Sequence, residues 1–312
     1  MGAQLRVYRS RIRSVQSTKK ITKAMELIAT SRIAKAQSRM QAARPYAEEL
    51  TRALAALGKN ASLKHPMLTG VETPRRVGIL LVTSDRGLAG GYSANAIKQA
   101  NDLADQLKAE GKEVVRYVIG RKGVAFYRFR HITVAGSWTG FSEQPNFHDA
   151  SAATETVVAA LTATSAGTTE DGEPGIDELY VVYTAFHNMV TQTPTSVVVS
   201  PVKSAEQGEP EALASAESAP QPSYDFEPEP EQLIAALLPR YISSRIYSAL
   251  LEAAASESAA RRRAMKSASD NATELIKTYT RLANQARQAE ITQEISEIVG
   301  GADALAAAGT DD

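Results

Sequence analysis

The sequence predicts a mixed α+β and α/β fold, in which N- and C-terminal helices form a long antiparallel coiled coil and a Rossmann-like α/β domain lies between them. Three observations support this prediction. Both ends of the 312-residue chain carry apolar residues at helical spacing. The segment between them alternates strand-like and helix-like runs, as α/β domains do. A Pro- and Glu-rich stretch separates that segment from the last helix.

Residues 1–58 are expected to form the first coiled-coil helix. Apolar side chains recur there at alternating spacings of three and four, the pattern of a coiled-coil seam. The longest such series is Ile33, Ala36, Met40, Ala43, Ala47, Leu50, Leu54 and Leu57. Pro45 lies inside the series and should kink the helix, and Gly58 is a natural end.

Residues 231–300 are expected to form the second coiled-coil helix. Its apolar stripe includes Ile242, Ile246 and Leu275. Because neither Pro nor Gly occurs from Tyr241 to Val299, the pair Gly300-Gly301 should end the helix and leave 301–312 as a tail. Neither helix can bury its stripe alone, so the two ends of the chain should pair with each other.

Residues 74–202 are expected to form the α/β domain, with a mostly parallel sheet. The expected strands are "VGILLVTS", "EVVRYVIG", "ELYVVYTA" and "SVVVSPV", and the expected helices are 92–110, 121–129 and 149–165. The polar stretch 165–175 should be an exposed acidic loop. Residues 203–230, rich in Pro and Glu, should be an extended connector.

The charge of the chain is balanced overall but unevenly distributed. Residues 1–44 contain eleven Lys or Arg and one acid, whereas residues 165–230 contain twelve acids and one base. Such asymmetry suggests surfaces that meet different partners. The chain has no cysteine, which excludes disulfides and thiolate chemistry, and no apolar run approaches the ~18 residues of a membrane span, so no direct membrane insertion is expected.

The turn Ser84–Gly91, "SDRGLAGG", raises the possibility of nucleotide chemistry. A strand, a glycine-rich turn and a helix form the layout that holds phosphate at a helix N-terminus, so a nucleotide-binding α/β enzyme is one alternative. However, the turn matches neither the dinucleotide-binding nor the P-loop pattern. The four histidines are scattered without metal-ligand spacing. No catalytic, cofactor-binding or metal-binding residue, and no cofactor, is therefore expected.

The basic first helix raises a second alternative, a coiled-coil arm that binds RNA. Its bases lie near one another at helical spacing: Arg6, Arg9, Arg13, Lys20 and Lys23. Base-stacking aromatic side chains do not accompany them, because Tyr8 stands alone. A basic helix can equally meet acidic protein loops, so no nucleic-acid partner is expected.

Several longer motifs point to one family. The segments are, in chain order, "IRSVQSTKKITKAMELIATSRIAKAQ", "SDRGLAGGYSANAIK", "YDFEPEP", "LLPRYISSRIYSALLEAAASE", "RRRAMKSASDNA" and "ITQEISEIVGGA". Together they resemble the gamma subunit of the F-type, proton-transporting ATP synthase, along essentially the whole chain. The match is weakest over residues 140–220.

This resemblance implies a central rotor shaft with no active site of its own. Such a shaft passes through a catalytic ring of alpha and beta subunits, and its foot contacts the epsilon subunit and the membrane c-ring. It couples proton flow to ATP synthesis or hydrolysis on the other chains. The implied location is the cytoplasmic face of the plasma membrane, where the protein is held through the complex.

The resemblance also implies roles for particular residues. Met25 matches a position that faces an acidic lever of a beta subunit, and Arg287 and Gln288 match positions that bind loops of the ring. The implied ring contacts are Lys20, Lys23, Met25, Arg287, Gln288, Thr292 and Glu294. The implied apolar tip, which turns in an apolar collar, comprises Ile291, Ile295, Ile298 and Val299. Phe226 and Glu227 match the foot.

Overall fold

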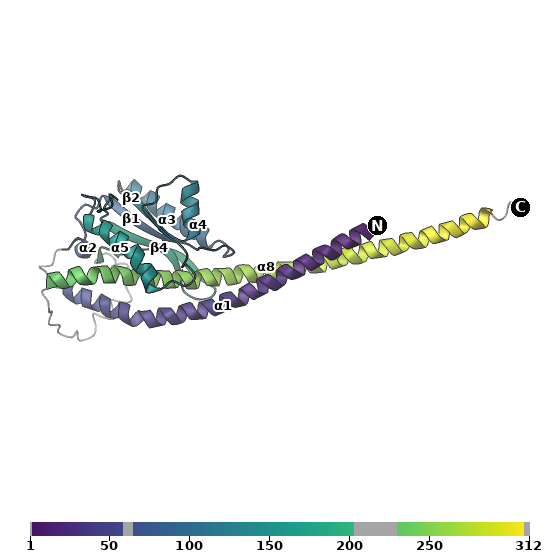
Figure 1. Ribbon diagram of the computed structural model, residues 1–312, viewed down its shortest axis with the longest axis horizontal. Coiled ribbons are helices and arrows are strands. Elements are labelled where there is room, and N and C mark those ends of the chain that lie inside the picture. Colours follow the sequence, from purple (N-terminus) through teal and green to yellow (C-terminus); the bar gives the residue numbers. More distant parts are fainter. Residues whose placement is uncertain (1, 59–64, 203–229, 309–312) are drawn as a thin grey trace. The chain divides into compact units, whose positions relative to one another are not determined.

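The computed structural model describes residues 2–58, 65–202 and 230–308, and confirms two long terminal helices with a central sheet domain (Figure 1). Two compact units can be distinguished. One combines the described residues up to Ile28 with those from Arg262 onward, and the other spans Ala29–Arg261. Helices α1 (Gly2–Gly58) and α8 (Pro230–Ala308) each contribute to both units. Most of the expected connector, including Phe226 and Glu227, lies outside the described residues.

In the first unit, α1 and α8 run antiparallel. The rings of Tyr8 and Tyr279 lie with centroids 6.4 Å apart, and the Oγ atoms of Thr22 and Ser269 lie 2.7 Å apart. The residue number therefore falls along α8 as it rises along α1. Alanines such as Ala272 are buried between the helices, where their small side chains allow close approach of the two backbones.

The bounds of the long helices differ from those expected. Helix α8 runs through Gly300-Gly301 to Ala308, so the prediction that this pair ends the helix is wrong. Glycine costs only about 1 kcal/mol relative to alanine in a helix, and neither glycine has the positive φ of a helix-ending residue. The alanines that follow favour continuation. Pro45 lies within α1, which continues to Gly58.

The second unit contains a five-stranded sheet of order β3-β2-β1-β4-β5. Its strands are β1 (Arg76–Val82), β2 (Glu113–Ile119), β3 (Gly136–Trp138), β4 (Glu178–Phe186) and β5 (Gln192–Ser200). All neighbours are parallel except β4 and β5, which confirms a mostly parallel sheet. The three-residue β3 is too short for a sequence signal. Strand β5 begins before Pro194, which an edge strand tolerates.

Helices cover both faces of this sheet (Figure 1). Helices α3 (Tyr92–Ala109) and α4 (Arg121–Phe129) pack on one face, and α5 (Phe147–Ala163), the short α2 (Pro66–Thr69) and α8 pack on the other. Strand β1 lies at the centre of the sheet. Its side chains alternate between the two cores, with Ile79 in one and Leu80 in the other.

The acidic stretch 165–175 is only partly exposed, in contrast to the prediction. Its tip at residues 170–172 is exposed, but at its base Ser165 is half-buried and Gly175 is buried. The Asp177 carboxylate accepts hydrogen bonds from the backbone N–H groups of Ser165, Arg75 and Arg76 at 2.8, 2.8 and 3.1 Å. Burial acts to raise the pKa of Asp177, but these donors outweigh it and hold the pKa below its usual value.

Candidate functional site

The glycine-rich turn at the carboxyl end of β1 holds an acidic side chain where a phosphate would be expected. Asp85 Oδ1 accepts a hydrogen bond from the backbone N–H of Arg121, the first residue of α4, at 3.1 Å. The next two N–H groups of α4 donate to Ser84 O and Thr83 Oγ1, both at 3.0 Å. Protein acceptors therefore occupy the first three N–H groups of α4, the helix that begins beside the turn.

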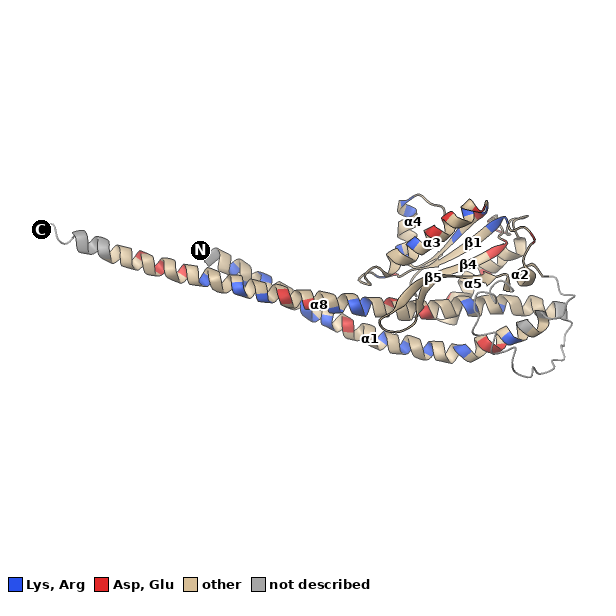
Figure 2. Cartoon of the chain, turned by 180° about the vertical axis from the view of Figure 1, so that it is seen from behind, with Lys and Arg blue, Asp and Glu red and all other residues tan. Residues whose placement is uncertain are grey.

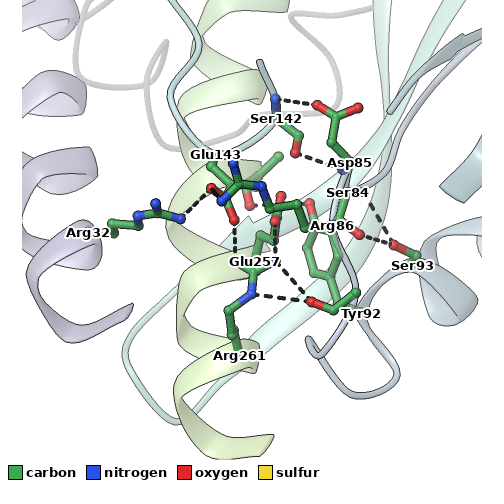
Figure 3. Close-up of polar contacts among 12 residues, drawn as sticks. Arg32, Ser84, Asp85, Arg86, Tyr92, Ser93, Ser142, Glu143, Glu257 and Arg261 are labelled. Carbon is green, nitrogen blue, oxygen red and sulfur yellow. Dashed lines mark hydrogen bonds and ion pairs between the residues drawn. The ribbon is translucent and has the colours of Figure 1, made fainter. Parts of the chain in front are cut away.

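The other carboxylate oxygen of Asp85 is also used. Asp85 Oδ2 accepts hydrogen bonds from the backbone N–H groups of Gly140 and Ser142 at 2.8 and 3.0 Å, and the Asp85 N–H donates to Ser142 Oγ (Figure 3). Because a negative carboxylate sits at this strand end, a phosphate there would be repelled. The geometry does not favour the nucleotide-binding enzyme alternative.

The turn instead joins the sheet domain to helix α8. The Tyr92 hydroxyl donates to the Ala253 carbonyl at 3.2 Å, and the Arg261 guanidinium donates to the Gly87 carbonyl at 3.3 and 3.4 Å. Arg261 also pairs with Glu257 one turn earlier on α8, at 2.6 Å. Burial raises the pKa of Glu257, and the charge of Arg261 opposes that rise. "SDRGLAGG" is thus a packing element.

The ring contacts implied on α1 lie in the first unit. Lys20 is exposed and Met25 is half-buried. Lys23, 59% exposed, forms an ion pair at 3.1 Å with Glu26, the single acid among the first 44 residues. Sequence reasoning missed this pair, although the i, i+3 spacing of a base and an acid on a helix is its usual signal.

The ring contacts implied on α8 lie within one stretch of that helix, residues 287–294. Arg287, Gln288, Thr292 and Glu294 are all exposed. Gln288 also lines an open hollow of about 550 Å³ along α8, with Ile276, Lys277, Thr280, Arg281, Asn284 and Gln285. Thr22 lies among the implied contacts on α1 and pairs with Ser269 on α8. Arg287 lies 18 residues (287 − 269) further along α8, so at 1.5 Å per residue the contacts implied on the two helices are separated by roughly 27 Å.

The implied apolar tip is an exposed apolar surface. Ile291, Ile295, Ile298 and Val299 are 43%, 56%, 72% and 53% exposed. Every described side chain from residue 291 to residue 302 is exposed. The Tyr8–Tyr279 pairing brings the start of α1 opposite residues well before Ile291, so within the described chain no helix covers this end. Exposed apolar clusters of this kind usually bind another protein.

Lys and Arg residues recur along α1 (Figure 2), but the aromatic residue beside them is engaged within the helix pair. Tyr8, the lone aromatic residue near the bases Arg6, Arg9 and Arg13, packs against Tyr279. Arg11 lies over the same Tyr279 ring, 5.7 Å from its centroid. Stacking of bases on these rings would require the helix pair to open, so the contacts argue against the RNA-binding alternative.

Two further features concern ions and membranes. In the described part of the chain, no group of three His, Asp or Glu side chains is arranged to hold a metal ion. Among residues 2–58, 65–202 and 230–308, no helix has the length and apolar character needed to span a bilayer.

Comparison with known proteins identifies the family. A family profile described as "ATP synthase" matches residues 4–305. The chain is 57% identical to the ATP synthase gamma chain of Salinispora arenicola over the full length of both proteins. A chain of the Euglena gracilis mitochondrial ATP synthase, seen by cryo-electron microscopy, matches 100% of this chain and 98% of its own length, with a TM-score of 0.67 and 16% identity. A chain from the Tetrahymena thermophila mitochondrial ATP synthase structure of the central stalk and c-ring matches 80% of this chain and 99% of its own, with a TM-score of 0.56 and 23% identity.

The two structural matches support the same fold, and the identity with the curated relative extends over every element described above. The protein belongs to the ATP synthase gamma chain family.

Proposed function

We propose that this chain is the central rotor shaft of an F-type ATP synthase and couples proton flow through a membrane ring to ATP synthesis or hydrolysis in a catalytic ring. The observation that carries the proposal is the uncovered apolar end of α8, on an antiparallel helix pair in a member of this family. An enzyme would need a site for chemistry, whereas a shaft needs a surface that turns inside a partner.

The mechanism follows from the asymmetry of a two-helix rod. A rod that occupies the centre of a ring of three equivalent catalytic subunits presents a different face to each of them. Each face stabilises a different conformation of its subunit, because a contact shifts a conformational equilibrium by its differential affinity for the two states. Rotation of the rod would then move the three sites through the same conformations in turn.

The residues implied on the two helices would make the specific contacts of the shaft. Met25, with Lys20 and Lys23 nearby, would face an acidic lever of a beta subunit. Because Lys23 already pairs with Glu26, an acidic lever would compete with Glu26 for that ammonium group. Arg287, Gln288, Thr292 and Glu294 would hydrogen-bond loops of the ring.

The apolar tip would turn against an apolar collar. Ile291, Ile295, Ile298 and Val299 offer the collar no directional bond, so rotation would require no hydrogen bond to break there. The foot would include Phe226 and Glu227 and would contact the epsilon subunit and the c-ring. The protein would then be held peripherally at the cytoplasmic face of the plasma membrane, through the complex.

Reconstitution tests the proposal. ATP hydrolysis is measured for a purified alpha–beta ring alone, for this chain alone, and for both together. The proposal expects activity that depends on the combination and none from the chain alone. Turnover by the chain alone, or a ring indifferent to the chain, would contradict it.

A variant pair tests the ring contacts. Arg287→Gln should lower the activity of the combined sample. Lys277→Gln is the matched control, because Lys277 is also an exposed base on α8 and its salt bridge with Glu274 is exposed, so it contributes little. Equal activities of the two variants would remove Arg287 from the proposed contact.

A further inference from the structure

The loop between β3 and α5 carries one acidic residue that contacts three separate elements of the second unit. Glu143, whose side chain is 13% exposed, forms ion pairs with Arg32 on α1, with Arg86 in the glycine turn at 3.4 Å, and with Arg261 on α8 at 3.1 Å (Figure 3). The side chains of Arg32 and Arg261 are 24% and 6% exposed, whereas that of Arg86 is 71% exposed. Glu143 therefore joins both long helices to the sheet domain, and the Arg86 contact is the weakest of the three.

The neighbours of Glu143 make this junction a closed polar cluster. Arg261 is also held by Glu257 and by the Gly87 carbonyl, so its guanidinium is fixed on two further sides. Reciprocal hydrogen bonds between Asp85 and Ser142 tie the glycine turn to the loop that carries Glu143. The turn and the loop thus form one rim of the domain, and both rest on α8.

Apart from the hydrogen bond from the Tyr92 hydroxyl to the Ala253 carbonyl, the other contact described between the sheet domain and α8 is apolar. Ile242, Ile246 and Leu250 belong to the apolar core shared with one sheet face. Hydrophobic contact is non-directional, so it resists separation of two surfaces more strongly than sliding between them. Charge-assisted contacts of a guanidinium and a carboxylate depend on direction and fix a register.

The geometry points to Glu143 as the positioning residue that locks the sheet domain to α1 and α8 in one register, and we propose that this lock transmits torque between the helices and the domain. The inference rests on the proposed function as a rotor shaft. Loss of the Glu143 charge would remove the ion pairs of Arg32 and Arg86 with this loop and leave Arg261 paired with Glu257, on its own helix. A buried guanidinium that loses a carboxylate partner favours rearrangement of the contact.

The test uses the assembled, membrane-bound complex with Glu143→Gln. ATP hydrolysis by the catalytic ring detached from the membrane should stay within about twofold of the wild type, because the tip and ring contacts are unchanged. ATP-driven proton pumping per ATP hydrolysed should fall by about threefold or more. Arg32→Gln should give a smaller loss, and Arg86→Gln should be near the wild type.

Glu49→Gln is the matched control, since Glu49 is an exposed acid on α1 that pairs with Arg52 at 2.7 Å. A pumping ratio for Glu143→Gln equal to that of Glu49→Gln would overturn the inference. Failure of the wild-type chain to activate the ring would instead contradict the proposed function. That result is obtained without any variant, so it can be told apart from a failure of this inference.

A spectroscopic measurement keeps the inference falsifiable if Glu143→Gln does not assemble. The chain has no cysteine, so spin labels can be attached at Asp105→Cys on α3 and Ala236→Cys on α8, both exposed positions. In the full-length chain, the distance distribution between the labels should be narrow for the wild type and for Glu49→Gln. It should broaden or shift for Glu143→Gln and for Arg32→Gln, and an unchanged distribution in both would overturn the inference.

Discussion

Replacement of Asp85 by Asn should destabilise the sheet domain strongly, although the change removes no volume. The Asp85 side chain is 9% exposed and accepts three backbone N–H groups, from Arg121, Gly140 and Ser142. Hydrogen bonds to a charged group contribute about 1.5–3 kcal/mol each, against about 1 kcal/mol for neutral ones. Asparagine keeps one acceptor oxygen and turns an NH₂ group toward donors. We therefore expect a loss of about 3 kcal/mol in the free energy of unfolding.

The single tryptophan of the chain makes this measurement specific to the domain. Trp138 lies in β3, and its carbonyl accepts from Gly120 at 2.8 Å, close to the loop that Asp85 holds. Urea unfolding followed by tryptophan fluorescence therefore reports on this part of the fold. With a slope of about 2 kcal/mol per molar urea, the midpoint should fall by about 1.5 M.

The matched control is Asp171→Asn at the exposed tip of the acidic loop, which should change the free energy of unfolding by less than about 0.5 kcal/mol. Equal midpoints for the two variants would refute the idea that the Asp85 carboxylate anchors the turn. Binding of ATP by the wild-type chain with an affinity that Asp85→Asn changes would refute the conclusion that this carboxylate fills the phosphate position.

Three further changes should have measurable effects. Thr22→Val should destabilise the helix pair by about 1–2 kcal/mol in thermal unfolding. The double variant Thr22→Val with Ser269→Ala should lose less stability than the sum of the two single variants, because no buried hydroxyl then lacks its partner. Stability losses that add up strictly would contradict this. Ile33→Ala, at a 2% exposed position, should cost about 3 kcal/mol, unlike Ile28→Ala, which starts 53% exposed. Asp177→Asn should cost about 2–4 kcal/mol at neutral pH. Because folding lowers the pKa of Asp177, its contribution to stability is present above the unfolded pKa of about 3.9 and is lost as the pH falls through the lower folded value. The difference in unfolding free energy between Asp177→Asn and the wild type should therefore shrink below about pH 4. A difference that stays constant with pH would contradict this assignment.

The helices and central strands could be predicted because each carries a long periodic signal. The two ends of the stripe, around Ile33 and Leu54, are buried as the spacing requires, while its middle, from Met40 to Ala47, is half-buried. Strand β1 is a nearly continuous apolar run, as a central parallel strand should be. The end of α8 could not be predicted, because each glycine of Gly300-Gly301 disfavours the helix by only about 1 kcal/mol relative to alanine. So small a free-energy difference does not decide whether the helix ends there or continues.

The polar contacts were the least predictable part. Glu143 and Arg32 are 111 residues apart in the sequence, and Glu143 lies in the stretch 140–220, where the resemblance to the family is weakest. Arg261 gave a weak signal, since it follows the alanine-rich run "EAAASESAA" on the face that packs against the domain. The role of Asp85 was hidden for another reason. The sequence "SDRGLAGG" supplies the glycines of an anion site, but only the fold brings residues 140–142 to the carboxylate.

The carboxylate in the glycine turn has a consequence for the protein in its cellular setting. A domain with this layout and vacant backbone donors would sense every change in the ATP and phosphate concentrations around it. Asp85 supplies an anion from within the chain, so the N–H groups of Arg121, Gly140 and Ser142 have their acceptor whether or not such metabolites are present. The local structure that these three groups hold together therefore needs no bound metabolite.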